Sequence, residues 1–252
     1  MDDIEGTIIH NKAIAPGHYL LKVSLVKPMD PMVPGQFVMV KIPDTEIFLR
    51  RPFSIYDYKR KTVSLMYKVV GKGTEALSRA VKNERVSVLC PLGKGFQVRK
   101  RQGYVVVAGG IGMAGVHALI KRLGKRATIF FGCTSKAELP LMGKAAGLNP
   151  YVATIDGSFG FRGNVIQLLE SHMAALEKKD IEVFACGPEN MLKNLRKLLE
   201  KNSIPCQASF EERMACGLGL CFGCVKKTID EREPYHRVCK EGPVFDLWQV
   251  CL

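Results

Sequence analysis

Alternating hydrophobic and polar positions dominate the first hundred residues. Residues 17–25 alternate with a period of about two, and residues 36–42 repeat this pattern after Pro34 and Gly35. A period of two is typical of strands that bury one face. The predicted strands here are 17–25, 36–42, 54–56, 63–69 and 85–89, with one helix at 74–81. Strands at this spacing predict a small antiparallel β-barrel.

Beyond residue 100 the pattern changes to continuous apolar runs separated by amphipathic segments. The run 104–108 ends in Gly109 and Gly110, as expected for a parallel strand that is buried on both faces. The predicted strands are 104–108, 127–131, 151–154 and 181–185, and the predicted helices are 113–123, 164–176 and 190–201. Alternation of strand and helix predicts a doubly wound α/β sheet.

The remaining segment, from Cys206 to the last residue, is rich in glycine and cysteine and shows little periodicity. We expect a lobe that is organised by something other than a hydrophobic core. The fold class is therefore multidomain, because 252 residues suit two or three compact units better than one. The expected units are a β-barrel at 1–99, an α/β domain at 100–205 and a small lobe at 206–252.

The formal charge of +13 makes nucleic acid the first partner to consider. The excess of lysine and arginine is spread over residues 1–205, however, and residues 206–252 are nearly neutral. No long basic run exists. Phosphate-bearing cofactors or an acidic partner explain this charge as well as nucleic acid does, and nucleic-acid binding is not expected.

No segment of the sequence has the pattern of a membrane span or a secretion signal. The N-terminus is acidic, whereas a signal peptide begins with basic and then apolar residues. The longest apolar stretch, 105–120, contains four glycines and a histidine and is too short to span a membrane. We therefore expect a cytoplasmic protein.

Four of the nine cysteines are crowded into the tail. Cys216, Cys221 and Cys224 follow the spacing C-x4-C-x2-C, and Cys239 lies further on. This is the plant-type ferredoxin spacing for a 2Fe-2S cluster, and the glycines between the cysteines allow a loop to wrap around such a cluster. A structural zinc site and a disulfide pair are the alternatives. Five further cysteines are scattered, and for most of them we expect a buried core thiol; they are Cys90, Cys133, Cys186, Cys206 and Cys251.

Two short motifs in the first unit suggest a bound phosphate group. Arg51-Pro52-Phe53-Ser54 stands at the entry of a predicted strand, and Gly71-Lys72-Gly73-Thr74 opens the predicted helix. An arginine, a hydroxyl group and a helix N-terminus can together neutralise a diphosphate. Each motif alone is also compatible with an ordinary turn.

Two glycine-containing motifs in the second unit follow predicted strands. Gly109-Gly110-Ile111-Gly112 links the end of one strand to a helix, and Cys186-Gly187-Pro188 follows another strand in the same way. Dinucleotides bind in this context because small residues let a pyrophosphate approach the backbone. Tight turns without any ligand are the alternative.

The order of these motifs resembles that of the ferredoxin–NADP reductase superfamily. The segments 210–217 and 237–245 narrow the resemblance to the family of electron-transfer subunits of NAD-dependent dihydroorotate dehydrogenases, over essentially the whole chain. The resemblance implies that the four tail cysteines bind a 2Fe-2S cluster. The implied FAD site consists of Arg51, Pro52, Phe53, Ser54, Met66, Tyr67, Lys68, Gly73 and Thr74. The implied NAD site consists of Gly109, Gly110, Gly112, Cys186, Gly187 and Pro188.

The resemblance also implies a partner. A separate FMN-containing subunit would oxidise dihydroorotate to orotate in pyrimidine biosynthesis, two copies of each chain would assemble, and electrons would pass through the cluster and FAD to NAD+. This chain would then have no catalytic residue of its own, and no residue marks a choice between NAD and NADP. The alternatives are a reductase subunit of a ferredoxin:NADP, sulfide dehydrogenase or hydrogenase complex, and, more distantly, a zinc protein that binds nucleic acid.

Overall fold

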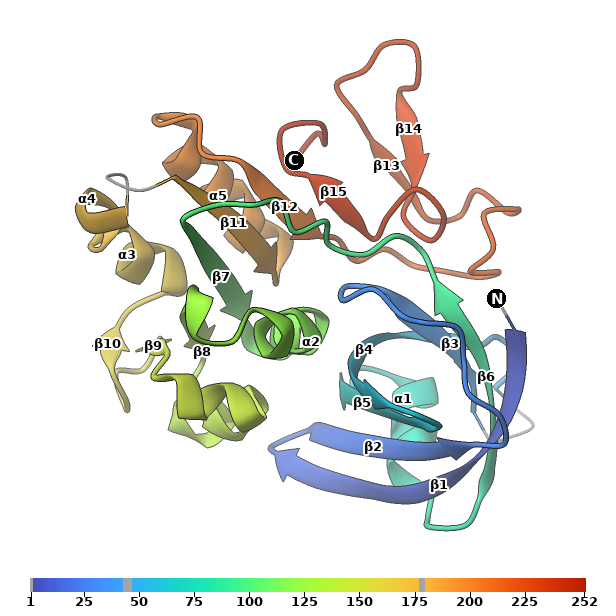
Figure 1. The fold of residues 1–252 in the computed structure, drawn as a ribbon. Coiled ribbons are helices and arrows are strands. Elements are labelled where there is room, and N and C mark those ends of the chain that lie inside the picture. Colours follow the sequence, from blue (N-terminus) through green and yellow to red (C-terminus); the bar gives the residue numbers. More distant parts are fainter. Residues whose placement is uncertain (1, 43–46, 177–179) are drawn as a thin grey trace.

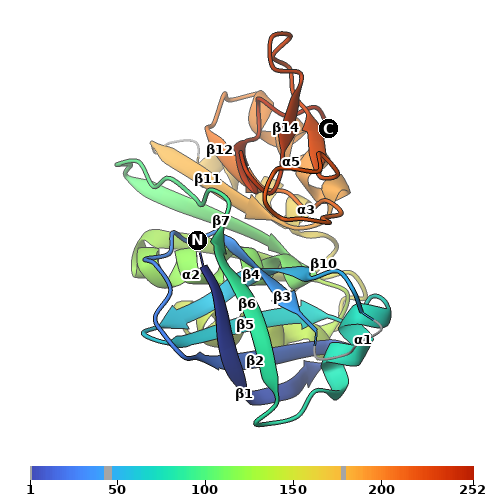
Figure 2. The same cartoon turned by 90° about the vertical axis from the view of Figure 1, so that its right-hand side faces the viewer.

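The computed structural model describes residues 2–42, 47–176 and 180–252 and arranges them as a barrel, a larger sheet and a C-terminal lobe (Figure 1). The barrel, in blue to cyan, lies below and beside the sheet. The lobe, in red, lies above both. In the turned view the lobe, in red, again lies above the barrel, in blue to cyan (Figure 2).

Six antiparallel strands close the barrel. In spatial order they are β1 (Asp2–Ala15), β2 (His18–Leu25), β5 (Thr62–Lys68), β4 (Arg51–Lys59), β3 (Phe37–Lys41) and β6 (Arg85–Leu92). Buried positions alternate along β6, so every second side chain enters the barrel core. Helix α1 (Lys72–Arg79) connects β5 to β6 and contributes Leu77 to the same core.

The sequence predicts the barrel but misses its first strand. Strand β1 pairs with β2 on one side and with β6 on the other, and it thereby closes the sheet. The acidic residues at its start occupy positions that are not buried, while Ile4 and Ile8 point into the core. Bulges interrupt its pairing with β2, and these irregularities weaken the period of two that identifies a strand.

The larger sheet has seven strands, with β15 antiparallel to its neighbour and the other pairs parallel. In spatial order they are β10 (Phe161–Arg162), β9 (Tyr151–Thr154), β8 (Ala127–Cys133), β7 (Gly103–Gly109), β11 (Ile181–Cys186), β12 (Cys206–Ser209) and β15 (Val244–Asp246). Side chains of β7 alternate between two cores: Val105 and Val107 face one, Val106 the other. Burial on both faces explains the continuous apolar run.

Helices cover both faces of this sheet. Helix α2 (Met113–Leu123) packs on the face toward the barrel, together with the 3-10 segment η3 (Lys136–Leu148). Helices α3 (Val165–Glu170) and α5 (Glu189–Glu200) share the core of the opposite face. The predicted helix 164–176 is interrupted, because a second short helix, α4 (Met173–Leu176), follows α3 after a break. Two further 3-10 turns are η1 (Gly110–Gly112) and η2 (Gly124–Arg126).

The C-terminal segment leaves the sheet at β12, forms the lobe, and returns to the sheet at β15. Within the lobe, β13 (Val225–Lys227) and β14 (Tyr235–Arg237) form a hairpin. The expectation of a lobe without a core is wrong in part, because Val238, Phe245 and Leu247 belong to the same core as α5. The boundaries at 99/100 and 205/206 stay predictions, and the sheet itself continues across residue 205.

None of the helices in the described ranges is long and apolar enough to cross a membrane.

Candidate cofactor-binding sites

A cavity of about 240 Å³ lies where the barrel, the larger sheet and the C-terminal segment meet. The barrel strands β4 and β5 form one wall, and η1 and α2 contribute Ile111 and Ala114. The segment that follows β12 closes the other side. Seven of the residues predicted for FAD line this cavity: Pro52, Phe53, Ser54, Met66, Tyr67, Lys68 and Thr74. The motifs that the sequence separates are therefore neighbours in space.

The other two predicted FAD residues, Arg51 and Gly73, lie against one another beside the cavity. A Cβ atom on Gly73 would be only 2.6 Å from Nε of Arg51, so glycine is what allows the guanidinium group to approach the helix. Nη1 of Arg51 donates a hydrogen bond to the carbonyl of Leu49 at 2.6 Å. Arg51 is thus fixed beside the first turn of α1, where the helix dipole and free amides favour an anion.

Thr74 holds the loop in front of α1 in shape. Its hydroxyl oxygen accepts hydrogen bonds from the amides of Val70 at 2.9 Å and Gly71 at 3.2 Å, and the hydroxyl donates to the carbonyl of Gly71 at 3.0 Å. These contacts order the helix start. The guanidinium group of Arg51 and the helix N-terminus are the groups that fit a diphosphate.

Aromatic side chains make the barrel wall apolar. The rings of Tyr19 and Tyr67 stack with centroids 5.5 Å apart, and Phe53 meets Tyr67 edge-on at 5.6 Å. The phenol of Tyr67 donates to Oδ1 of Asn11 at 3.1 Å. Burial raises the pKa of Tyr67 to about 12, so this phenol stays protonated. A planar ring system such as that of a flavin suits this wall.

The wall of the cavity that faces the barrel was not predicted from the sequence as part of the site. Phe210, Glu211, Glu212 and Met214 line the cavity from the segment between β12 and Cys216. Their position at the carboxyl end of a parallel strand is the signal that could have found them. Glu211 is exposed at the cavity mouth, yet the surrounding protein crowds its carboxyl group, and this partial burial raises the pKa of Glu211.

The two predicted NAD motifs pack directly against each other at the carboxyl ends of β7 and β11. A Cβ atom on Gly109 would lie 2.7 Å from Sδ of Met191 and 3.0 Å from Pro188, and a Cβ atom on Gly112 would collide with the carbonyl of Cys186. Glycine at these positions lets the two loops approach. Gly110, by contrast, faces open space with φ of 52°.

Cys186 connects this region to the cavity. A Cβ atom added to Gly115 would lie 2.7 Å from Sγ of Cys186 and 3.6 Å from Oγ of Ser54, so both side chains lie near the same point of α2. Burial, assisted by the charge of Glu211, raises the pKa of Cys186 to about 12. The thiol is therefore neutral, and it is inert as a nucleophile. A nicotinamide group bound against these two loops would lie beside the cavity.

The four tail cysteines share one chemical feature, which is that each sulfur accepts a backbone amide. The amide of Leu218 lies 3.3 Å from the sulfur of Cys216, and that of Gly223 lies 3.4 Å from the sulfur of Cys221. The amide of Cys239 lies 3.4 Å from the sulfur of Cys224, and the sulfur of Cys239 accepts from the amide of Gly219 at 3.1 Å. Amides directed at sulfur stabilise thiolates. Burial opposes this at Cys216, but the amides of Leu218 and Cys221 outweigh it and lower the pKa of Cys216 to about 6.

The sulfurs are arranged as two pairs, Cys216 with Cys221 and Cys224 with Cys239. Among the described residues, no group of three or more His, Cys, Asp or Glu is placed to hold a single ion. A zinc site needs four ligands around one ion, whereas each iron of a 2Fe-2S cluster takes two thiolates. All nine cysteines are free thiols. Four thiolates paired in this way fit a 2Fe-2S cluster.

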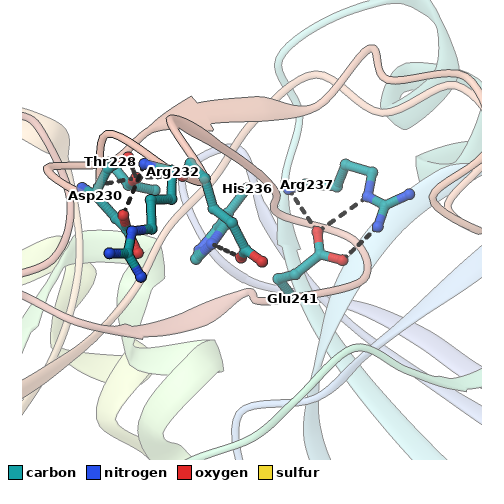
Figure 3. A network of polar contacts seen from close by, with 7 residues as sticks. Thr228, Asp230, Arg232, His236, Arg237 and Glu241 are labelled. Atoms are coloured by element: carbon teal, nitrogen blue, oxygen red, sulfur yellow. Dashed lines mark hydrogen bonds and ion pairs between the residues drawn. The ribbon is translucent and has the colours of Figure 1, made fainter.

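Arg237 fastens the cysteine loop to the hairpin (Figure 3). Its guanidinium group forms two hydrogen bonds with Glu241, at 2.6 and 3.0 Å, donates to the carbonyl of Gly219 at 2.8 Å, and lies 4.8 Å from the ring centroid of Phe222. Beside it, Thr228 and Asp230 hold the turn between β13 and β14. The loop is therefore held from one side.

The outer side of the loop is open. Cys221 is exposed, and Leu220 and Phe222 on either side of it are 77% and 60% exposed. Large apolar side chains beside an exposed ligand are typical of a protein contact site. Cys224 and Cys239, in contrast, are buried against the core of the larger sheet.

Comparisons with known proteins agree with this arrangement. Residues 211–251 match the iron-sulfur cluster binding domain of dihydroorotate dehydrogenase B. The chain is 37% identical, over 94% of both chains, to the dihydroorotate dehydrogenase B (NAD(+)) electron transfer subunit of Desulforamulus reducens, and 39% identical, over 98% of this chain and 97% of the relative, to that of Enterococcus faecalis. A chain in the structure of an NADH-dependent reduced ferredoxin-NADP oxidoreductase shares the fold, with a TM-score of 0.85 and 24% identity over 98% of this chain and 89% of that one.

Proposed function

We propose that this chain carries electrons from a dihydroorotate-oxidising subunit to NAD+. The premise is that the chain belongs to the family of dihydroorotate dehydrogenase B (NAD(+)) electron transfer subunits. The observation that carries the proposal is the segment between β12 and Cys216. It forms one wall of the cavity and leads directly into the cysteine loop. The flavin site and the cluster site are therefore built from one continuous stretch of chain.

Each proposed cofactor has its own set of residues in this chain. Tyr67 and Phe53 provide an aromatic wall for FAD, and Arg51 with the start of α1 receives the diphosphate. The proposed cluster ligands are Cys216, Cys221, Cys224 and Cys239. When bound, the cluster exchanges single electrons and FAD exchanges either one electron or a hydride, so together they connect one-electron and two-electron chemistry.

Protein groups orient the nicotinamide cofactor. The loops at Gly109–Gly112 and Cys186–Pro188 form the proposed site for NAD, in which the helix start and small residues receive the pyrophosphate. Ser54 and Cys186 lie where this site meets the cavity. Both are neutral groups that fix geometry, and no residue here is placed as a general base. The chain positions cofactors, and substrate oxidation belongs to the partner.

The partner binds, in this proposal, at the exposed rim of the cysteine loop. Leu220 and Phe222 supply apolar contact, and the exposed Cys221 brings the cluster close to the partner surface. The expected partner is an FMN-containing catalytic subunit in pyrimidine biosynthesis, with two copies of each chain and a cytoplasmic location. The carboxylates of dihydroorotate and orotate are thus handled outside this chain.

An absorption spectrum followed by reconstitution tests the proposal. Purified chain should show the absorption of oxidised flavin and of an iron–sulfur cluster. Addition of the catalytic subunit should then give dihydroorotate-dependent reduction of NAD+. A colourless protein without iron or flavin would contradict the cofactor assignment. A coloured protein that assembles with the subunit but gives no coupling would instead indicate another reductase complex.

A further inference from the structure

A buried ammonium group connects the cysteine lobe to the cavity wall. Lys226 lies on β13, two residues after Cys224, and only 9% of it is exposed. Its Nζ donates to Glu189 at 2.8 Å and to Glu212 at 3.1 Å, and it lies 5.8 Å from the ring centroid of Phe210. Its neighbour Lys227 is exposed.

The partners of Lys226 come from two other parts of the molecule. Glu189 is the first residue of α5 and follows the proposed NAD loop directly. Glu212 and Phe210 line the proposed flavin cavity. One side chain therefore joins the segments that hold all three proposed cofactors. None of the roles described so far uses it.

The geometry makes this contact sensitive to loss of the positive charge. Since both carboxylate oxygens lie within about 3 Å of one nitrogen, they can be no more than about 6 Å apart. Removal of the ammonium group leaves two like charges that repel each other. Glu212 would then move, and Phe210 and the cavity wall would move with it.

We propose that Lys226 is a positioning residue of the electron path. It fixes the wall 210–214 to the cysteine lobe and to α5, and it thereby sets the separation and the electrostatic potential between the flavin and cluster sites. This inference rests on the proposed function. It concerns how the two sites are kept together, which neither family membership nor the cysteine spacing addresses.

The test compares four forms of the full chain loaded with FAD and cluster: wild type, Lys226→Met, Lys226→Arg and Lys193→Met. Lys193 is the matched control because it also binds Glu189, at 3.0 Å, but does not contact Glu212. In stopped-flow mixing, NADH would give a hydride to the flavin and leave as NAD+, after which one of the two electrons would pass to the cluster and the other would stay on the flavin. Flavin and cluster absorbance report the two phases separately.

For Lys226→Met we expect the ratio of the cluster rate to the flavin rate to fall by about tenfold, because small displacements of reacting groups have large effects on rate. The flavin midpoint potential, measured by spectroelectrochemical titration, should become more negative, since a positive charge that contacts the cavity wall is lost. Lys226→Arg should restore both quantities toward wild type, and Lys193→Met should leave both unchanged.

An unchanged rate ratio and potential in a loaded Lys226→Met protein would overturn the proposal, as would failure of Lys226→Arg to restore either quantity. If Lys226→Met does not retain its cofactors, Glu212→Gln takes its place, since it weakens only the tie to the cavity wall by turning the ion pair into a neutral hydrogen bond. That variant should also lower the rate ratio, but should shift the potential in the positive direction. Unchanged values there would equally overturn the proposal. A wild-type chain in which NADH reduces neither group would instead contradict the proposed function.

Discussion

Individual cysteines in the loop differ in what surrounds them, and this predicts different consequences of substitution. Cys221 is exposed at the rim, whereas Cys224 and Cys239 are buried in the core shared with α5. Substitution at the rim should therefore affect the cluster and leave the packing intact. Substitution at the buried positions should affect both.

Cys221→Ser should impair the cluster and reduce dihydroorotate-dependent reduction of NAD+ by about a hundredfold or more, the loss typical when an essential group is removed. Direct oxidation of NADH with an artificial acceptor should remain, because the cavity and the nucleotide loops are not touched. Steady-state assays of both reactions measure this. Cys251→Ser removes a free tail thiol and is the control. Loss of both reactions while FAD stays bound would contradict the linear electron path.

Glu211 provides a prediction about pH at the residue scale. Burial raises the pKa of this carboxyl group in the folded protein. A carboxyl group whose pKa is higher in the folded than in the unfolded state stabilises the folded state only while it is protonated. This contribution is complete below the unfolded-state pKa and is lost as the pH rises through the folded-state pKa. Glu211→Gln should therefore melt at a higher temperature than wild type near neutral pH, and the difference should shrink toward acid.

Thermal unfolding of the cofactor-free chain at a series of pH values measures this effect. Glu231→Gln, in an exposed turn of the lobe, is the matched control and should follow wild type. A melting difference between Glu211→Gln and wild type that grows toward acid would show that the sign of the shift is wrong.

At the scale of elements, α1 depends on one side chain from β1. Nδ2 of Asn11 donates to the carbonyl of Leu77 at 2.7 Å, near the end of α1, and its Oδ1 accepts from Tyr67. Asn11→Ala leaves the phenol of Tyr67 unsatisfied and removes one of the two hydrogen bonds to the carbonyl of Leu77, and it should destabilise the chain by about 1–3 kcal/mol. It should also weaken FAD binding, because α1 and Tyr67 both border the cavity.

Urea unfolding and FAD titration measure the two consequences. Lys12→Ala is the control, since Lys12 is the exposed neighbour on the same strand. Unchanged FAD affinity in Asn11→Ala would mean that α1 does not contribute to the diphosphate site.

Elements with a clear pattern in their own residues could be predicted from the sequence. Elements that are defined by contacts with distant parts of the chain could not. The strand around Val106 is recognisable because both of its faces are buried, and the four tail cysteines are recognisable from their spacing. Strand β1 has bulges and is identified only by its two neighbours. The wall at Phe210 joins the site only because β12 ends beside the barrel. The contacts of Lys226 bring together charges that are far apart in sequence.

At the scale of the whole molecule, the exposed rim should determine assembly. Leu220→Ser together with Phe222→Ser removes the apolar contact beside Cys221 and should weaken binding of the catalytic subunit by about 2 kcal/mol or more, as loss of a central apolar contact usually does. NADH oxidation with an artificial acceptor should be unaffected. Titration calorimetry measures the affinity.

Val26→Ser and Val81→Ser are controls, because both residues are exposed apolar side chains of the barrel, away from the cysteine loop. Equal affinity of the rim variant and wild type would place the partner on a different face. Lower affinity in the barrel variants would do the same.

The return of the chain to the sheet has a consequence for how the protein matures. Strands β12 and β15 pair side by side, with Ala208 opposite Phe245, so both ends of the lobe are fixed next to each other. Iron insertion then has to order only a closed loop, which loses less chain entropy than a free tail of the same length would. The cluster-free chain should therefore hold the two ends of the lobe together before any iron is bound.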